Sequence, residues 1–121
     1  MKNLIIICSL AFLSACYYDN EEELYKYYNQ VPCDTSVFTF SQKVYPLIDA
    51  NCNSCHSNTA MSGNISSEGY ANVKTLVDNG KLWGVISYQN GFSPMPKNGA
   101  KLSDCNLGLI KKWIDAGAPN N

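Results

Sequence analysis

Two cysteines and a histidine at fixed spacing carry the clearest chemistry in this 121-residue chain. They form the pattern Cys-x-x-Cys-His at Cys52, Cys55 and His56. Two thiols at this spacing can form thioether bonds to two vinyl groups on one edge of a porphyrin, and the next residue then lies beneath the iron. An imidazole in that position is a common proximal iron ligand. The pattern therefore predicts covalent attachment of one haem, with His56 bound to its iron.

Two other kinds of site use the same pair of cysteines. A Cys-x-x-Cys pair can form a redox-active disulfide, and it can supply half of a four-ligand zinc site. The redox alternative needs a βαβ context, which the flanking sequence lacks, and the zinc alternative needs further ligands. The remaining cysteines, none of them paired at short spacing, are Cys8, Cys16, Cys33 and Cys105. Haem attachment is therefore the preferred interpretation.

The iron of such a haem can take a second axial ligand from another side chain of the protein. His56 is the only histidine in the chain, so a second imidazole is not available. A methionine sulfur raises the reduction potential, which suits electron transfer. Met61 follows His56 by five residues, too few to carry the chain round the haem to its other face. Met95 lies 39 residues after His56 and has a proline on each side, which stiffens the loop. We predict Met95 as the second ligand; an open or water-bound iron is the alternative.

Helical patterns surround these residues, and no strand pattern competes with them. The first helix is expected to have Ser41 as its N-cap, and the last to begin at Ser103. The expected helices cover residues 39–51, about 67–79, a short turn at 82–86, and 103–116. We predict an all-α domain of three to four helices around one haem. The haem must supply much of the core because residues 33–121 number only 89.

Aromatic and basic side chains lie near the predicted site in the sequence. Trp83 is expected in the core, where it is a candidate for packing against the haem and for donating its indole N–H to a propionate. Lys97 and Lys101 flank the Met95 loop and are candidates for steering acidic partner proteins. A solvated surface is the simpler interpretation of these two lysines.

The N-terminal part reads as a targeting segment followed by a tether. A short positive start and the apolar run from Leu4 to Leu13 predict a signal peptide, and the small residues before Cys16 resemble the lipobox of bacterial lipoproteins. We predict residues 1–15 as the signal peptide, 16–32 as a flexible acidic tether lipidated at Cys16, and 33–121 as the domain. An ordinary signal with a spare cysteine is the alternative. We expect export, with the protein lipid-anchored on the periplasmic or outer-membrane and cell-surface side.

Two cysteines remain once the others have roles. Cys8 would leave with the signal peptide, and Cys16 would carry lipid. Cys33 and Cys105 are then an even pair in an oxidising compartment. We predict a disulfide between them, which would close a loop of about 70 residues and contribute about 2–4 kcal/mol by restricting the unfolded chain. Two buried free thiols are the alternative.

The charge of the chain gives no sign of nucleic-acid binding. The formal net charge is −1, and four acids fall between Asp19 and Glu23. Residues 33–121 contain six acids and seven lysines, a balance of +1. This is far from the basic surface that nucleic-acid partners require.

A block near the C-terminus carries a resemblance to a known family. It contains Met95-Pro96, Leu102-Ser103, Ile110, Trp113-Ile114 and Gly117-Ala118. Together with the haem motif, it resembles the small class I monohaem cytochromes c, in the lipoprotein form of secreted Bacteroidetes and planctomycete domains. The resemblance covers roughly residues 38–118. It implies thioethers at Cys52 and Cys55 and axial ligands His56 and Met95.

The resemblance also implies a small cytochrome c fold in which the first and last helices cross and pack. The apolar residues expected to meet are Val44, Leu47 and Ile48 on one helix and Ile110, Trp113 and Ile114 on the other. Such a crossing would make Cys33 and Cys105 neighbours.

The resemblance implies electron transfer rather than enzymatic activity. One covalently attached haem c would cycle between Fe(III) and Fe(II), exchanging electrons with redox partner proteins that the sequence does not identify. Two alternatives stay open: a haem module of a larger redox complex, and an open-site haem enzyme of a peroxidase-like or gas-binding kind. A single histidine and the lack of arginine argue against peroxidase chemistry, which needs a distal acid or base.

Overall fold

This computed structural model describes residues 33–121, which contain four α-helices and two short helical turns. In chain order they are the π-helical turn η2 (Phe40–Val44), α3 (Tyr45–His56), the 3-10 turn η3 (Ser62–Asn64), α4 (Tyr70–Asp78), α5 (Lys81–Ser87) and α6 (Asp104–Asp115). No strand occurs in this range, so the predicted all-α class is confirmed. The predicted signal peptide, the lipidated Cys16 and the tether lie outside the described residues.

The first helix begins differently from the sequence prediction. Ser41 is not its N-cap but lies inside η2, which continues directly into α3. The wider π turn ends where the Tyr45 N–H donates to the Phe40 carbonyl, just before Pro46, which has no N–H to donate. The N–H groups of Phe40 and Ser41 are capped instead by Asn121, through its side-chain Oδ1 and its carbonyl, each at 2.8 Å.

The last helix agrees closely with its prediction. Ser103 is the N-cap of α6, and its Oγ accepts from the Asn106 N–H at 3.3 Å, which confirms the expected start. Gly117 ends the helix at φ 92°, where the Ala118 N–H donates to the Trp113 carbonyl at 2.9 Å. A glycine at this position adopts the left-handed conformation without steric cost.

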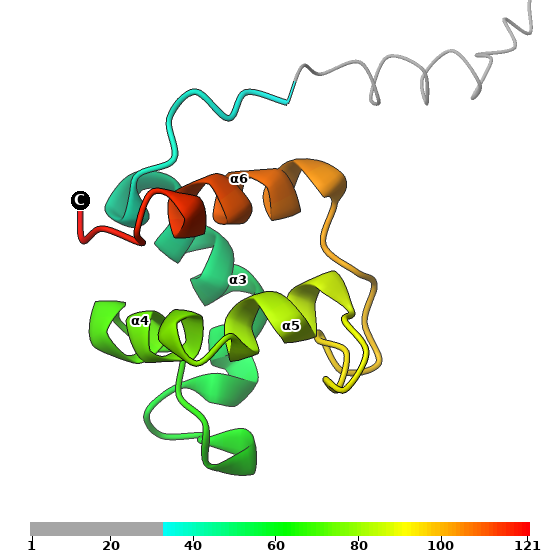
Figure 1. Ribbon diagram of the computed structural model, residues 1–121. Coiled ribbons are helices and arrows are strands. Elements are labelled where there is room, and N and C mark those ends of the chain that lie inside the picture. The colour runs from blue at the N-terminus through cyan, green and yellow to red at the C-terminus, as the bar shows by residue number, and fades with distance from the viewer. Residues whose placement is uncertain (1–32) are drawn as a thin grey trace, which may run out of the picture. The chain divides into compact units, whose positions relative to one another are not determined.

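A cluster of aromatic rings closes one end of the domain. The ring centroid of Phe40 lies 5.1 Å from that of Tyr70, 5.3 Å from that of Tyr45 and 5.4 Å from that of Trp113. We call these four residues the aromatic end. Figure 1 shows α6 crossing the first turns of α3 here. The apolar residues that the family resemblance expected to meet are all in this core or packed against it: Val44, Leu47, Ile48, Ile110, Trp113 and Ile114.

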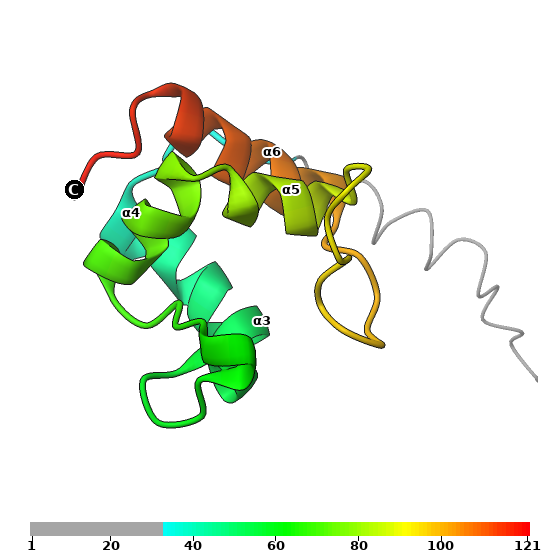
Figure 2. The same cartoon turned by 60° about the horizontal axis from the view of Figure 1, so that its bottom comes forward.

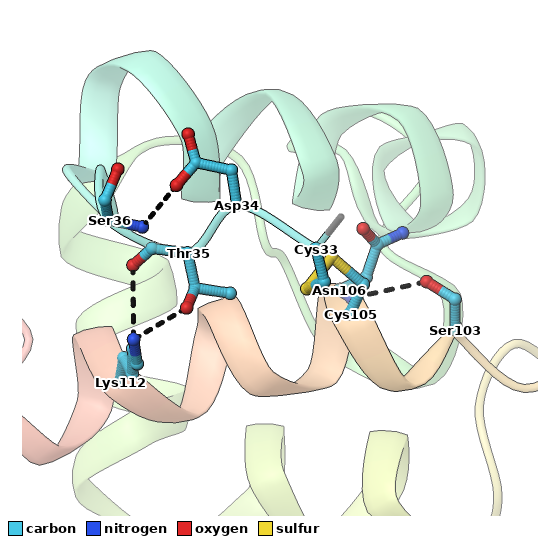
Figure 3. Close-up of a disulfide and its surroundings, with 8 residues drawn as sticks. All are labelled: Cys33, Asp34, Thr35, Ser36, Ser103, Cys105, Asn106 and Lys112. Carbon is cyan, nitrogen blue, oxygen red and sulfur yellow. Dashed lines mark hydrogen bonds between the residues drawn. A yellow bond between two sulfur atoms is a disulfide. The ribbon is translucent and has the colours of Figure 1, made fainter. Parts of the chain in front are cut away.

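A disulfide fastens the start of the described chain to α6 (Figure 3). The Cys33 and Cys105 sulfur atoms are 2.08 Å apart, and their Cα atoms are 5.4 Å apart. About two turns further along α6, Lys112 Nζ donates to Thr35 Oγ1 at 2.6 Å. The segment that leads into η2 therefore runs along the outside of α6, held at two points.

Candidate haem-binding site

A cavity of about 100 Å³ lies between α3, α5 and the loop that precedes α6. Its wall is apolar, and it collects three of the residues that the sequence pointed to: Cys52, His56 and Met95. Figure 2 shows the C-terminal end of α3 and the loop between α5 and α6 on the same side of α5. The other lining residues are Ile65, Ser67, Leu76, Lys81, Leu82, Val85 and Ile86.

The cysteine–histidine motif is part of α3. The first helix was predicted to end at Asn51, but it continues to His56, so the motif forms its last turn. Residues four apart share one face of a helix, which is why Cys52 and His56 both line the cavity. Cys55 is exposed and does not line it. The two thiols therefore have different surroundings although they are only three residues apart.

Burial makes the Cys52 thiol a weaker acid. It raises the pKa of Cys52 to about 11, because a thiolate is poorly solvated among apolar walls. Cys52 is therefore a neutral thiol near pH 7. Cys52 lines the same cavity as His56.

The half-buried imidazole of His56 has one fixed hydrogen-bond partner. Its Nδ1 lies 3.3 Å from the Ile65 carbonyl oxygen. A carbonyl only accepts, so Nδ1 carries the proton and donates. In the tautomer with its proton on Nδ1, the ring keeps a lone pair on Nε2, the form in which histidine binds a metal.

The loop that carries Met95 is fastened to α5. The Met95 N–H donates to the Val85 carbonyl at 3.0 Å. The Phe92 ring packs against Gly84 so closely that a Cβ there would lie 2.6 Å from ring carbons. The Met95–Pro96 peptide bond is cis. Met61, the other methionine considered as a ligand, is 45% exposed and does not line the cavity.

The predicted contribution of Trp83 has less support in the structure. Trp83 is half-buried and packs against the core, but it does not line the cavity. Lys111 Nζ of α6 lies 5.8 Å from its ring centroid. Packing of Trp83 against a haem and its bond to a propionate stay predictions. The same holds for partner steering by Lys97, which is exposed, and by Lys101, whose Nζ lies 5.2 Å from the Tyr88 ring centroid.

Sequence reasoning missed several residues of this site. Lys81 supplies the one charged side chain among the cavity-lining residues, at the first position of α5. Ile65 contributes its carbonyl to His56, and Ser67 lies next to it in the wall. A hydrophobic pattern could have suggested Ile65 as a core residue. No local pattern singles out Lys81 or Ser67, because their roles depend on how separate segments meet.

Comparisons with protein-family models, with curated proteins and with solved structures find no match to this chain. Within residues 33–121, no three or more His, Cys, Asp and Glu side chains gather into a group able to hold a metal ion. The helices of this same range include none long and apolar enough to cross a membrane.

Proposed function

We propose that this protein is an electron-transfer protein, a monohaem c-type cytochrome with His56 and Met95 as the axial ligands of its iron. One observation carries the proposal. A histidine in an attachment motif and a methionine 39 residues later line the same apolar cavity, and a motif cysteine lies beside them. The types and spacing of these residues predict them as ligands, and the cavity that they share supports this prediction.

The donor groups suit a covalently bound haem. Cys52 and Cys55 would hold it through thioethers, His56 would bind the iron through the free Nε2, and Met95 through its sulfur. The apolar walls formed by Leu82, Val85 and their neighbours would contact the ring and exclude water. When bound, the haem iron supplies a one-electron oxidation and reduction.

The size and charge of the cavity add two expectations. Small-molecule sites commonly measure about 300–1,000 Å³, and this cavity of about 100 Å³ is smaller. A porphyrin held here would therefore keep an edge in solvent, which is the edge that a redox partner protein can approach. Lys81 would give a carboxylate of the porphyrin a cationic partner without requiring a buried charge, because its side chain is exposed.

The protein's own contribution is to keep both ligands in place in the two oxidation states. The Ile65 carbonyl fixes the orientation and tautomer of the His56 ring. The Val85 carbonyl holds the backbone of Met95, and Phe92 anchors the same loop on α5. Ligands held in this way would keep structural change small, and the apolar wall would favour the less charged, reduced form of a bound haem.

An open-site haem enzyme is the second candidate. The methionine in the cavity favours the electron carrier, because a bound thioether leaves no free position for peroxide or a gas. Besides His56, the cavity-lining residues include no histidine and no carboxylate to serve as a distal acid or base. Export and lipid anchoring at Cys16 are parts of the proposal that rest on the sequence, and a haem module of a larger redox complex stays an alternative.

A Met95→Ala variant tests the ligand assignment, with Met61→Ala as the matched control. We expect Met95→Ala to abolish the weak far-red band that a methionine sulfur gives to ferric haem, and to lower the potential because a soft ligand of the ferrous state is lost. Met61→Ala should change neither. An unchanged spectrum and potential in Met95→Ala would refute the assignment. A wild-type protein that lacks the band and binds carbon monoxide readily would favour the open-site enzyme.

A further inference from the structure

Hydrogen bonds join Asn53, the first of the two residues between the motif cysteines, to the segment that contacts the His56 ring. Asn53 follows Cys52, and its Oδ1 accepts from Ser67 Oγ at 2.7 Å. The N–H of Ser67 donates to the carbonyl of His56, also at 2.7 Å. Ile65, whose carbonyl accepts from the His56 ring, lies two residues before Ser67. The side chain of Asn53 therefore meets the short segment that orients the imidazole.

Because Ser67 is buried, loss of its hydrogen bond to Asn53 would displace the segment around it. Ser67 is 3% exposed and is the one polar residue among 33–121 that is buried. A buried hydroxyl that loses its partner keeps its desolvation cost, so the segment around it must shift to find another. The second acceptor within reach of Ser67 Oγ is the His56 carbonyl, at 3.4 Å, which already accepts from the Ser67 N–H. Asn53 is thus the main partner of this hydroxyl.

The amide of Asn53 is itself held from the other side. Its Nδ2 donates to Asp49 Oδ1 at 2.7 Å and lies 3.5 Å from the hydroxyl oxygen of Tyr45. That same Tyr45 oxygen accepts from the Gly69 N–H at 3.1 Å. The segment from Ile65 to Gly69 is therefore attached to α3 at its middle and at its end, with Asn53 at the centre.

We propose that Asn53 is a positioning residue for the axial imidazole. By holding Ser67 it keeps the Ile65 carbonyl against Nδ1 of His56, which fixes the ring orientation and raises the electron density that Nε2 offers to a metal. Thioether attachment itself asks nothing of the two residues between the cysteines, so this role is additional to the motif chemistry. The inference rests on the proposed function, because it concerns the ligand of the proposed haem.

The test compares variants of the full-length protein with attached haem. Asn53→Ala and Ser67→Ala break the link from its two sides. Asn51→Ala is the matched control, because Asn51 lies on the same helix, is exposed, and donates only to the Leu47 carbonyl one turn earlier. The measurement is the solvent exchange rate of the His56 Nδ1 proton in the reduced protein, followed by NMR. His56 is the only histidine, so the signal is unambiguous.

We expect exchange of this proton to be about tenfold faster in Asn53→Ala and in Ser67→Ala, the factor that about 1.4 kcal/mol of hydrogen-bond stability represents. The double variant should be no faster than the faster single variant, because both substitutions break one link. The potential should rise in the same two variants and stay unchanged in Asn51→Ala. Wild-type exchange rates in Asn53→Ala and Ser67→Ala, or an equal acceleration in Asn51→Ala, would overturn the inference. A wild-type protein that carries no haem would instead overturn the proposed function on which it rests.

Discussion

The two ends of α3 lie in contrasting surroundings. At the aromatic end, Trp113 is fully buried and its indole N–H donates to the Pro119 carbonyl at 2.9 Å. Tyr70 donates its hydroxyl to the Ala118 carbonyl, also at 2.9 Å. At the other end, the last turn of α3 borders a cavity with apolar walls, and Cys52 and His56 there are only half-buried.

The contrast separates a part of the domain that is closely packed from a part that borders a cavity. The aromatic end is filled by its own side chains, and the polar groups of Tyr45, Tyr70 and Trp113 have hydrogen-bond partners. At the cavity end, apolar side chains from several segments line a cavity of about 100 Å³ beside Cys52 and His56. We therefore expect substitutions at the aromatic end to change stability, and substitutions at the cavity end to change the spectrum and potential of the proposed haem.

Trp113→Ala should have the largest effect. Removal of a fully buried tryptophan from among Phe40 and its neighbours is expected to lower the free energy of unfolding by about 3–5 kcal/mol. Denaturant unfolding of the holoprotein measures it. The ferric spectrum of the folded fraction should be unchanged, because Trp113 does not line the cavity. A loss below about 1 kcal/mol, at the level of an ordinary surface change, would show that the aromatic end does not carry the stability.

Loss of the disulfide should have the next largest effect on the free energy of unfolding. Cys33→Ser combined with Cys105→Ser frees a loop closed over a sequence separation of 72 residues, and should cost about 2–4 kcal/mol. The double variant and the wild-type protein are compared with the haem iron in the same oxidation state, so that only the disulfide differs between them. Identical unfolding of the double variant and the wild-type protein would contradict a stabilising disulfide. The haem spectrum should be unaffected.

Gly84→Ala tests the link between the Met95 loop and α5. The new Cβ would lie 2.6 Å from the Phe92 ring, so the ring and its loop must move. We expect a cost of about 1–3 kcal/mol from overpacking and a weaker far-red band, because Met95 follows Phe92 in the displaced loop. Gly108→Ala in α6 is the matched control, since a Cβ there has nothing within 4 Å. A full-strength band in Gly84→Ala would mean that Phe92 does not position Met95.

Lys81→Met should have the smallest effect on stability, within about 0.5 kcal/mol, as for other surface positions. Its expected effect is a lower potential, because a carboxylate of the haem left without a cation stabilises the ferric state. Lys101→Met removes the same charge away from the cavity and is the control. Equal potentials in these two variants would show that Lys81 has no special relation to the cofactor.

Local signals explain what the sequence predicted well. The Ser103 cap and the Gly117 stop define α6 within one residue at each end, because both act on neighbouring backbone groups. The choice of Met95 over Met61 followed from chain length and from the prolines beside Met95, and of these two methionines only Met95 lines the cavity with His56.

Interactions between distant segments explain what the sequence could not predict. The cap of the first helix comes from Asn121, 81 residues after Phe40, so Ser41 was a reasonable but wrong choice. Helix α4 begins at Tyr70 and not at about residue 67 as predicted, because Ser67 is hydrogen-bonded to Asn53 and His56. Such partners are visible only once the helices are packed.

The intact mass of the denatured protein is the most direct test of the central claim, that Cys52 and Cys55 hold a haem covalently. The protein should be produced by export in bacteria that have a c-type haem attachment system. The expected result is an added mass of one haem, retained after denaturation and lost when both Cys52→Ser and Cys55→Ser are present. A wild-type mass without haem, or haem still attached to the double variant, would contradict the claim.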